Sequence, residues 1–106
     1  MKLKPLNIFG QEIKVEIEDL SANGFAGQYD FDNKKISIDT NCKEKLATYF
    51  HECLHGCWYR LGIHQTKIPH EVHEIVVEGF SRFLEENFEQ ILHARKQFLK
   101  ESKKRK

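Results

Sequence analysis

Five consecutive residues, His51-Glu52-Cys53-Leu54-His55, combine side chains and a spacing that can bind and use a metal ion. Residues four apart on a helix lie one turn apart on the same side. His51 and His55 can therefore present imidazole nitrogens to one zinc ion, which binds such nitrogens at about 2.0–2.1 Å. Glu52 is offset by about 100° around the helix, so it can reach a water on the open side of the ion without being a ligand.

This separation of metal ligands from a carboxylate base predicts hydrolysis of peptide bonds in a protein or peptide substrate. Zinc lowers the pKa of a bound water to about 7, and Glu52 would accept the proton that the water loses. The hydroxide would attack a carbonyl carbon, and Glu52 would then donate the proton to the leaving amine. The alternative interpretation is a polar helix face whose side chains have ordinary hydrogen-bond partners.

A catalytic zinc site usually has three protein ligands and one open position, so a third ligand is needed. The longer form of the motif has Gly and His three and six places after the second histidine, but here Trp58 and Leu61 occupy those positions. The third ligand must then come from another element. We favour Glu74 among four candidates that follow the motif: Glu71, His73, Glu74 and Glu78.

The residues before the motif predict three short strands. Ile13, Val15 and Ile17 alternate with charged residues, which is typical of a strand with one buried face. Residues 27–31 and 36–39 are further strand candidates, and the turn residues between them predict a hairpin. Whether 36–39 is a sheet edge that could bind an extended peptide is left open by the sequence.

Apolar residues at helical spacing predict two main helices after the strands. The first begins near Lys43, carries Phe50 and Leu54 on one face, and ends at Gly62. The second runs from about His70 into the nineties. Strands grouped before helices predict an α+β fold, in which a small three-stranded antiparallel sheet with a hairpin packs on the two helices.

The chain resembles the minimal zincin-like metallopeptidases of phages, prophages and mobile elements over roughly residues 24–90. Four segments carry the resemblance: Gly27-Gln28-Tyr29-Asp30, Lys35-Ile36-Ser37-Ile38-Asp39, residues 48–56 with the motif, and residues 74–84 beginning Glu74-Ile75-Val76-Val77-Glu78. The resemblance implies a zincin-like fold, zinc as the cofactor and peptidase activity. It also implies His51, His55 and Glu74 as the zinc ligands and Glu52 as the general base.

Several roles are not decided by the sequence. A non-enzymatic phage or prophage interaction or regulatory module, stabilised by zinc, is the alternative function. Four residues are candidates for stabilising the oxyanion: Tyr29, His64, His70 and His73. Cys53 and Cys57 could form half of a thiolate zinc site with His64, but no second cysteine pair exists and we do not favour it.

The 106 residues fit one domain, which we expect over residues 1–94, followed by a basic tail at 95–106. From Arg95 onward there are seven Lys or Arg and one Glu, which leaves 10 basic and 15 acidic residues in positions 1–94. We expect the tail to end a helix and then to fray or be disordered. Nucleic-acid binding through this tail is a partner interaction that we consider but do not favour.

The sequence predicts no membrane segment, because no apolar run approaches the roughly 18–20 residues that a spanning helix needs. No secretory signal is visible at the start of the chain. The three cysteines are an odd number, which argues against a disulfide framework. We therefore expect a cytoplasmic protein with reduced thiols, whose oligomeric state the sequence leaves open.

Overall fold

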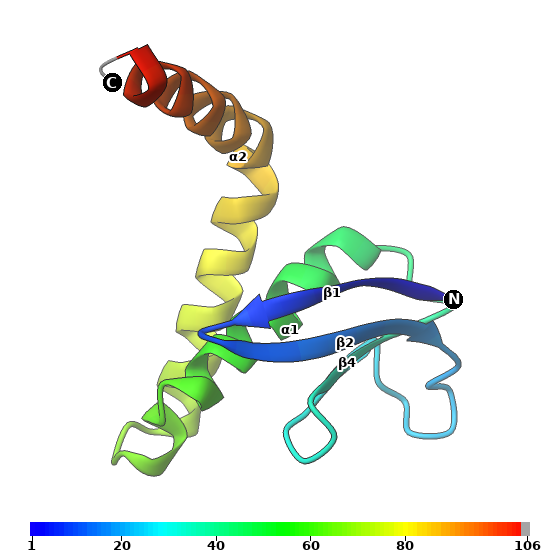
Figure 1. Ribbon diagram of the computed structural model, residues 1–106. Helices are drawn as coiled ribbons and strands as arrows, with labels where there is room; N and C mark the ends of the chain where they lie inside the picture. The colour runs from blue at the N-terminus through cyan, green and yellow to red at the C-terminus, as the bar shows by residue number, and fades with distance from the viewer. Residues whose placement is uncertain (105–106) are drawn as a thin grey trace.

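The computed structural model describes residues 1–104, and strands precede helices throughout (Figure 1). The order is β1 (Lys2–Ile8), β2 (Gln11–Glu18), β3 (Gly27–Asp30), β4 (Lys35–Asp39), α1 (Lys45–Arg60), a 3-10 turn η1 (Ile63–Gln65) and α2 (His70–Lys104). The expected α+β class is therefore confirmed. The predicted end of the first helix is also present, since Gly62 follows α1 with a left-handed φ of 75°.

The sheet has four strands in the order β1-β2-β4-β3 and is mixed, so the expectation of three antiparallel strands was wrong in detail. β1 pairs antiparallel with β2, and β3 pairs antiparallel with β4, as the hairpin prediction requires. β2 and β4 run parallel, with Val15 opposite Ile36. β1 was missed because it lacks a clean alternation and contains Pro5, which is tolerated at a sheet edge, and its register shifts between Leu3 and Leu6.

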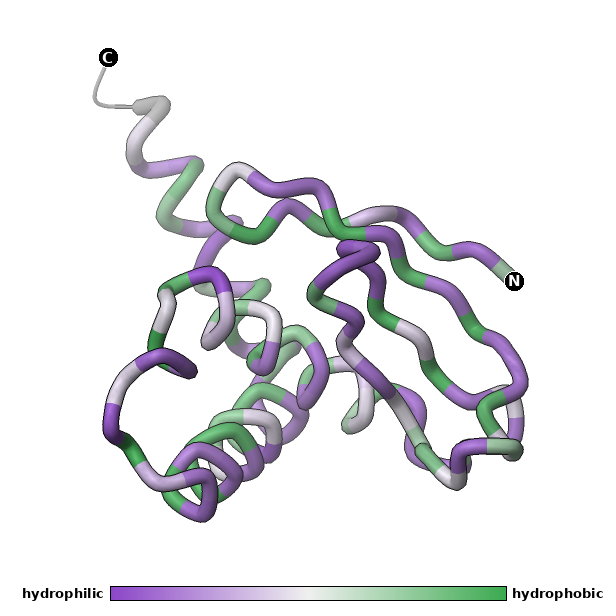
Figure 2. Tube along the Cα trace, turned by 90° about the horizontal axis from the view of Figure 1, so that it is seen from below, coloured by the Kyte–Doolittle hydropathy of each residue, from purple (hydrophilic) through white to green (hydrophobic). Residues whose placement is uncertain are grey.

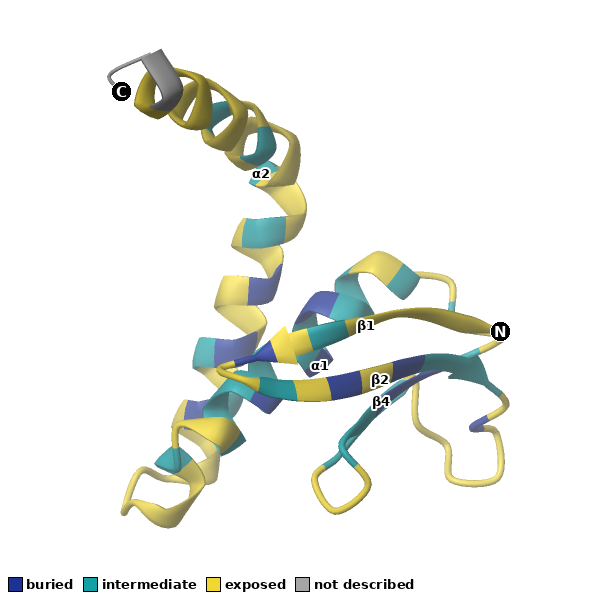
Figure 3. Ribbon diagram, in the orientation of Figure 1, coloured by how far each residue is buried: buried dark blue, intermediate teal, exposed yellow. Residues whose placement is uncertain are grey.

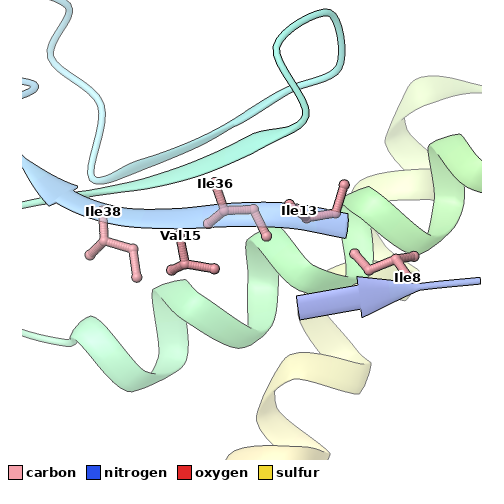
Figure 4. Packing of buried hydrophobic residues seen from close by; sticks show 5 residues of the cluster. All are labelled: Ile8, Ile13, Val15, Ile36 and Ile38. Carbon is pink, nitrogen blue, oxygen red and sulfur yellow. The ribbon is translucent and has the colours of Figure 1, made fainter. Parts of the chain in front are cut away.

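The core lies between one face of this sheet and α1. Five buried aliphatic side chains from β1, β2 and β4 form it: Ile8, Ile13, Val15, Ile36 and Ile38 (Figure 4). Alternate residues of a strand point to the same face, so the predicted period of two on β2 is what buries these side chains. α1 covers them with Tyr49, Cys53 and Cys57. This packing fixes the rotation of α1 and turns the motif histidines away from the sheet.

Within the described part of the chain, α2 packs against α1 and against no strand. Phe50 of α1 and Phe88 of α2 mark one end of this contact, with ring centroids 5.4 Å apart. Beyond it α2 projects away from the sheet (Figure 1). The helix was expected to end in the nineties, yet it continues to Lys104 because residues 95–104 contain no glycine or proline. Residues 105 and 106 of the tail lie outside the described residues.

Hydrophobic and hydrophilic residues are interspersed along both helices (Figure 2). No helix among residues 1–104 is both long enough and apolar enough to cross a membrane.

Candidate metal centre

The two histidines of the motif and one glutamate of α2 converge. His51 and His55 lie one turn apart on α1, with their Nε2 atoms 3.0 Å from each other. Glu74, near the start of α2, places Oε2 3.8 Å from Nε2 of His51 and Oε1 3.6 Å from Nε2 of His55. These ligand atoms all lie within 4.8 Å of one another, so the three residues could hold one metal ion.

The separations of these atoms fit tetrahedral coordination. Ligand atoms that lie about 2.0–2.1 Å from a zinc ion at tetrahedral angles are about 3.3 Å from each other. The two Nε2 atoms are 3.0 Å apart, and they lie 3.8 and 3.6 Å from different oxygens of the Glu74 carboxylate, so these separations lie near that value on either side. Two imidazoles and one carboxylate leave a fourth position for a water or a substrate, as in catalytic zinc sites.

Nδ1, the ring nitrogen that does not face the other motif histidine, has its own partner in both His51 and His55. Nδ1 of His51 lies 3.3 Å from Oε2 of Glu78, and Nδ1 of His55 lies 3.1 Å from Nε2 of His73. A histidine that binds a metal through Nε2 carries its proton on Nδ1 and donates it to such a partner. In that tautomer the two Nε2 lone pairs face each other at 3.0 Å, an arrangement that a metal ion between them would stabilise; with one Nε2 protonated, the same distance is a hydrogen bond between the rings.

His55 is suited to act as a neutral ligand. Burial lowers the pKa of His55 from 6.5 to about 4, and the neighbouring His51 acts in the same direction. Burial also lowers the pKa of His73. Because a metal binds only the unprotonated imidazole, protons do not compete for His55 at neutral pH.

Glu52 lies beside this group and is 8% exposed. It is absent from the residues whose ligand atoms converge. Burial raises the pKa of Glu52 from 4.5 to about 7, and the charge of Glu74 adds to the rise. A hydrogen bond from the backbone N–H of Tyr29 to Glu52 has the opposite effect. A carboxyl group with a pKa near neutrality can both accept and return a proton.

Gly27 of β3 makes room for Glu52. A Cβ atom at Gly27 would lie 2.5 Å from Cγ2 of Thr48 and 3.2 Å from Cγ of Glu52. No larger residue fits there without displacing one of these side chains. Close approach of the β3 backbone to α1 therefore depends on this glycine.

The remaining candidates for third ligand occupy other positions. Glu71 is exposed and lies outside the converging sets. Glu78 contacts Nδ1 of His51, the ring nitrogen that does not face Glu74, and also pairs with Arg82 at 3.2 Å. A second converging set consists of His70, His73 and Glu74. It competes with the first for Glu74, and its His70 side chain is 79% exposed. We favour the first set because the Nδ1 atoms of both of its imidazoles contact another side chain, Glu78 or His73.

Of the four candidates for oxyanion stabilisation, three have their side chains engaged elsewhere. The ring of Tyr29 packs on Gly56, and its buried hydroxyl has no hydrogen-bond partner among the described residues. His64 packs against Tyr59, with ring centroids 4.6 Å apart and an angle of 43° between the planes. His73 lies behind His55, which leaves His70 at the rim, with Nε2 3.6 Å from Oε1 of Glu74.

A cleft of about 700 Å³ adjoins His51 and Glu52 and lies between β3, α1 and α2. Five glutamates line the cleft: Glu44, Glu52, Glu78, Glu85 and Glu86. Its single arginine, Arg82, is paired with Glu78. The cleft is therefore strongly negative and suited to basic segments of a peptide.

The thiolate alternative is not supported by the cysteines. All three are free, and Cys53 and Cys57 pack against the hydrophobic core. Burial raises the pKa of the Cys53 thiol to about 12 and that of Cys57 above its ordinary value. Both are therefore protonated at neutral pH, whereas zinc binds the thiolate.

Two features of the site were missed from the sequence. Trp58 lies flat against His73, with ring centroids 4.3 Å apart and an angle of 5° between the planes. Its spacing of three from His55 places it on the same side of α1 and could have indicated this role. Glu85 follows Glu78 by seven residues, so the same helical spacing could have placed it in the cleft.

No family model, curated protein or solved structure matches this chain.

Proposed function

We propose that the chain is a zinc-dependent peptidase, with His51, His55 and Glu74 as the zinc ligands and Glu52 as the general base. The observation that carries the proposal is the convergence of two imidazole Nε2 atoms and one carboxylate within 4.8 Å, beside a buried carboxyl group at the edge of a cleft. A zinc ion held there would supply Lewis-acid chemistry and make water acidic enough to lose a proton near neutral pH.

The protonation of Glu52 matches the role of a base. With a pKa of about 7, it is partly ionised at neutral pH, so it can take a proton from water and return it to a leaving amine. His51 and His55 hold their Nε2 atoms toward the ion because Glu78 and His73 fix the opposite edges of the rings. These contacts reduce the freedom of the ligands before substrate binds.

The edge strand β3 offers a place for an extended substrate. β4 lies inside the sheet, so β3 and not residues 36–39 forms the edge beside the cleft. The N–H of Asp39 donates to the carbonyl of Ala26, and the alternation of an antiparallel pair then turns the backbone groups of Gly27 and Tyr29 away from β4. A peptide in the cleft could pair with Gly27, and the glutamates would favour one with Lys or Arg residues.

Comparison of Glu52→Gln with His55→Ala tests this proposal. Glu52→Gln should bind zinc as the unchanged chain does and lose cleavage of a Lys- and Arg-containing peptide library read by mass spectrometry. His55→Ala should lose both zinc and cleavage. Glu89→Gln, which neutralises an exposed carboxylate of α2 outside both the metal group and the cleft, is the matched control and should retain both. Release of zinc by Glu52→Gln would contradict the assigned roles.

The second candidate function is a non-enzymatic module that holds zinc for stability. It is favoured by His70, whose Nε2 lies 3.6 Å from Oε1 of Glu74 and could supply a fourth protein ligand. A closed site of four protein ligands is structural. This alternative predicts that His70→Ala weakens zinc binding, and that chelation lowers the melting temperature of a chain that cleaves no peptide in the library.

A further inference from the structure

One side of the first half of α2 is apolar and uncovered. Six residues at helical spacing form this outer face: Val72, Ile75, Val76, Gly79, Phe80 and Phe83. Ile75 is 71% exposed, Phe80 is 57% exposed and Phe83 is 53% exposed. A stripe with this spacing is the pattern of a helix face that packs against another element. α2 thus has one apolar face against α1 and a second with no cover within residues 1–104 (Figure 3).

The outer face is separate from the metal centre. Val76 follows Glu74 by two residues and Phe80 follows Glu78 by two, and two residues correspond to about 200° around a helix. The two glutamates contact His51 of α1, whereas the outer face is turned away from that histidine, and its edge residues Val76 and Phe80 border a groove beside the end of α1. A partner on the outer face leaves the cleft open.

We propose that the outer face pairs with the same face of a second copy of this chain, with the two α2 helices antiparallel and crossing at Gly79. A glycine inside a helix is unfavourable, and a Cβ at Gly79 would meet nothing within 4 Å in the single chain. The missing side chain therefore has no packing role within one copy. At a crossing point it lets two helix backbones approach closely.

The neighbouring surface complements the aromatic residues of the face. A shallow groove of about 260 Å³ runs between the end of α1 and α2, lined by apolar side chains that include Leu61, Trp58 and Phe80. Leu61 is itself 61% exposed. An aromatic ring of the second copy can enter this groove, and the two-fold symmetry of a dimer repeats the contact on the other side.

The exposed area is sufficient for a weak specific dimer. A fully exposed aromatic side chain presents about 200 Å², so the uncovered parts of the outer face and Leu61 amount to roughly 500 Å² per copy. Two copies together reach the approximately 1,000 Å² that a specific interface needs. An interface at this lower limit is expected to be weak and transient.

The distribution of charge selects the antiparallel arrangement. The outer face itself contains no charged residue. The basic tail begins at Arg95, sixteen residues after Gly79, which is about 24 Å along the helix. Antiparallel helices place the two tails at opposite ends of the pair, each beginning about 24 Å along the helix from the crossing, which is more than a Debye length at physiological salt. Parallel helices would place two segments of net charge +4 (residues 95–104) side by side.

Sedimentation equilibrium of the full chain tests the proposal. The unchanged chain should dimerise, and Phe80→Glu should raise the dissociation constant at least tenfold. Gly79→Arg should also abolish the dimer while raising the melting temperature of the monomer, because it replaces a glycine inside a helix without a clash. That opposite effect on the monomer separates loss of the interface from loss of the fold.

Phe9→Glu is the matched control, since Phe9 is 60% exposed but lies between β1 and β2. It should leave the dissociation constant unchanged. Raising salt from about 0.05 to 0.5 M should change that constant less than about threefold if the tails lie apart. A chain that stays monomeric at about 500 μM, an equal effect of Phe9→Glu, or a dimer that survives Gly79→Arg would each overturn the proposal.

Discussion

His73 lies directly behind His55, with its Nε2 atom 3.1 Å from Nδ1 of His55. The ring of His73 is itself fixed by Trp58, which lies flat against it. Trp58 and His73 are thus stacked, and His73 meets His55, a candidate metal ligand, edge to face at an angle of 72°. The two nitrogens of His55 have different roles in this arrangement, since Nδ1 is held by the protein and Nε2 faces Glu74.

This relationship predicts that His73→Ala weakens zinc binding about 10–100-fold, the range for removal of a group that orients a metal-ligating histidine. Without His73, the Nδ1–H of His55 loses its acceptor and the ring can rotate. The dissociation constant is measured by competition with a chromophoric chelator, with circular dichroism to show that the fold persists. His64→Ala is the control, because His64 packs against Tyr59 and is not among the converging residues. Equal effects of the two substitutions would contradict the specific role of His73.

Glu78 is expected to support His51 in the same way. Its Oε2 atom lies 3.3 Å from Nδ1 of His51, so a carboxylate accepts the proton and makes the ring a better electron donor to the metal. Glu78→Gln keeps the shape of the side chain but removes the charge. We expect zinc affinity to fall about tenfold in the same competition assay.

Glu86→Gln provides the comparison for Glu78→Gln, since Glu86 lines the same cleft, whereas the carboxylates that pair with His51 and His55 in the described chain belong to Glu74 and Glu78. If zinc affinity depended only on the total negative charge of the cleft, removing one carboxylate charge would lower the affinity equally in both variants. Only a larger loss in Glu78→Gln supports a direct role beside His51.

The juxtaposition of His51 and His55 on α1 could be predicted from the sequence because its geometry is local. The spacing of His51 and His55 determines that both lie on one side of a helix, whatever the helix packs against. The choice of Glu74 was harder, since four candidates follow the motif on α2. It depends on the rotation of α2, which is set by the burial of His73 and Val77 against α1. The metal and the reaction remain predictions.

The pairing of strands in the sheet was also hard to predict, because the paired residues are far apart in the sequence. The alternation of β2 was visible, yet its parallel pairing with β4 joins residues about twenty positions apart, as in Val15 and Ile36. Nothing local to either strand specifies that partner. The first strand was overlooked for a different reason, since Pro5 is read as a break in a strand although a sheet edge accepts it.

Gly27 is expected to be essential for the fit of β3 against α1. A Cβ at this position would lie 2.5 Å from Cγ2 of Thr48, and Thr48 is β-branched and stiff. Gly27→Ala should therefore lower the free energy of unfolding by about 1–3 kcal/mol in urea denaturation. Thr48→Ser removes the clashing methyl group and keeps the hydroxyl. The double variant should regain most of the loss, and a purely additive result would show that this contact is not the cause.

The last prediction concerns the cost of burying Glu52 in the metal-free chain. Its pKa rises from 4.5 in the ordinary state to about 7 in the fold. Below pH 4.5 the carboxyl group is neutral in both the folded and the unfolded chain, so ionisation costs nothing. As the pH rises from 4.5 to 7 the unfolded chain loses this proton first, and the free energy of unfolding falls by up to about 3 kcal/mol.

A glutamine is neutral at every pH and has the same size as glutamate. The free energy of unfolding of Glu52→Gln should therefore not fall in this way as the pH rises. In the presence of a chelator, it should match the unchanged chain in free energy of unfolding at pH 4 and exceed it by up to about 3 kcal/mol at pH 8. The change in His55 protonation is common to both proteins and cancels in the difference. Glu86→Gln, at an exposed position, should show no such pH-dependent gain. A Glu52→Gln chain that is less stable at pH 8 would mean that the carboxylate is stabilised in the fold, and that Glu52 is not poised to take a proton near neutrality.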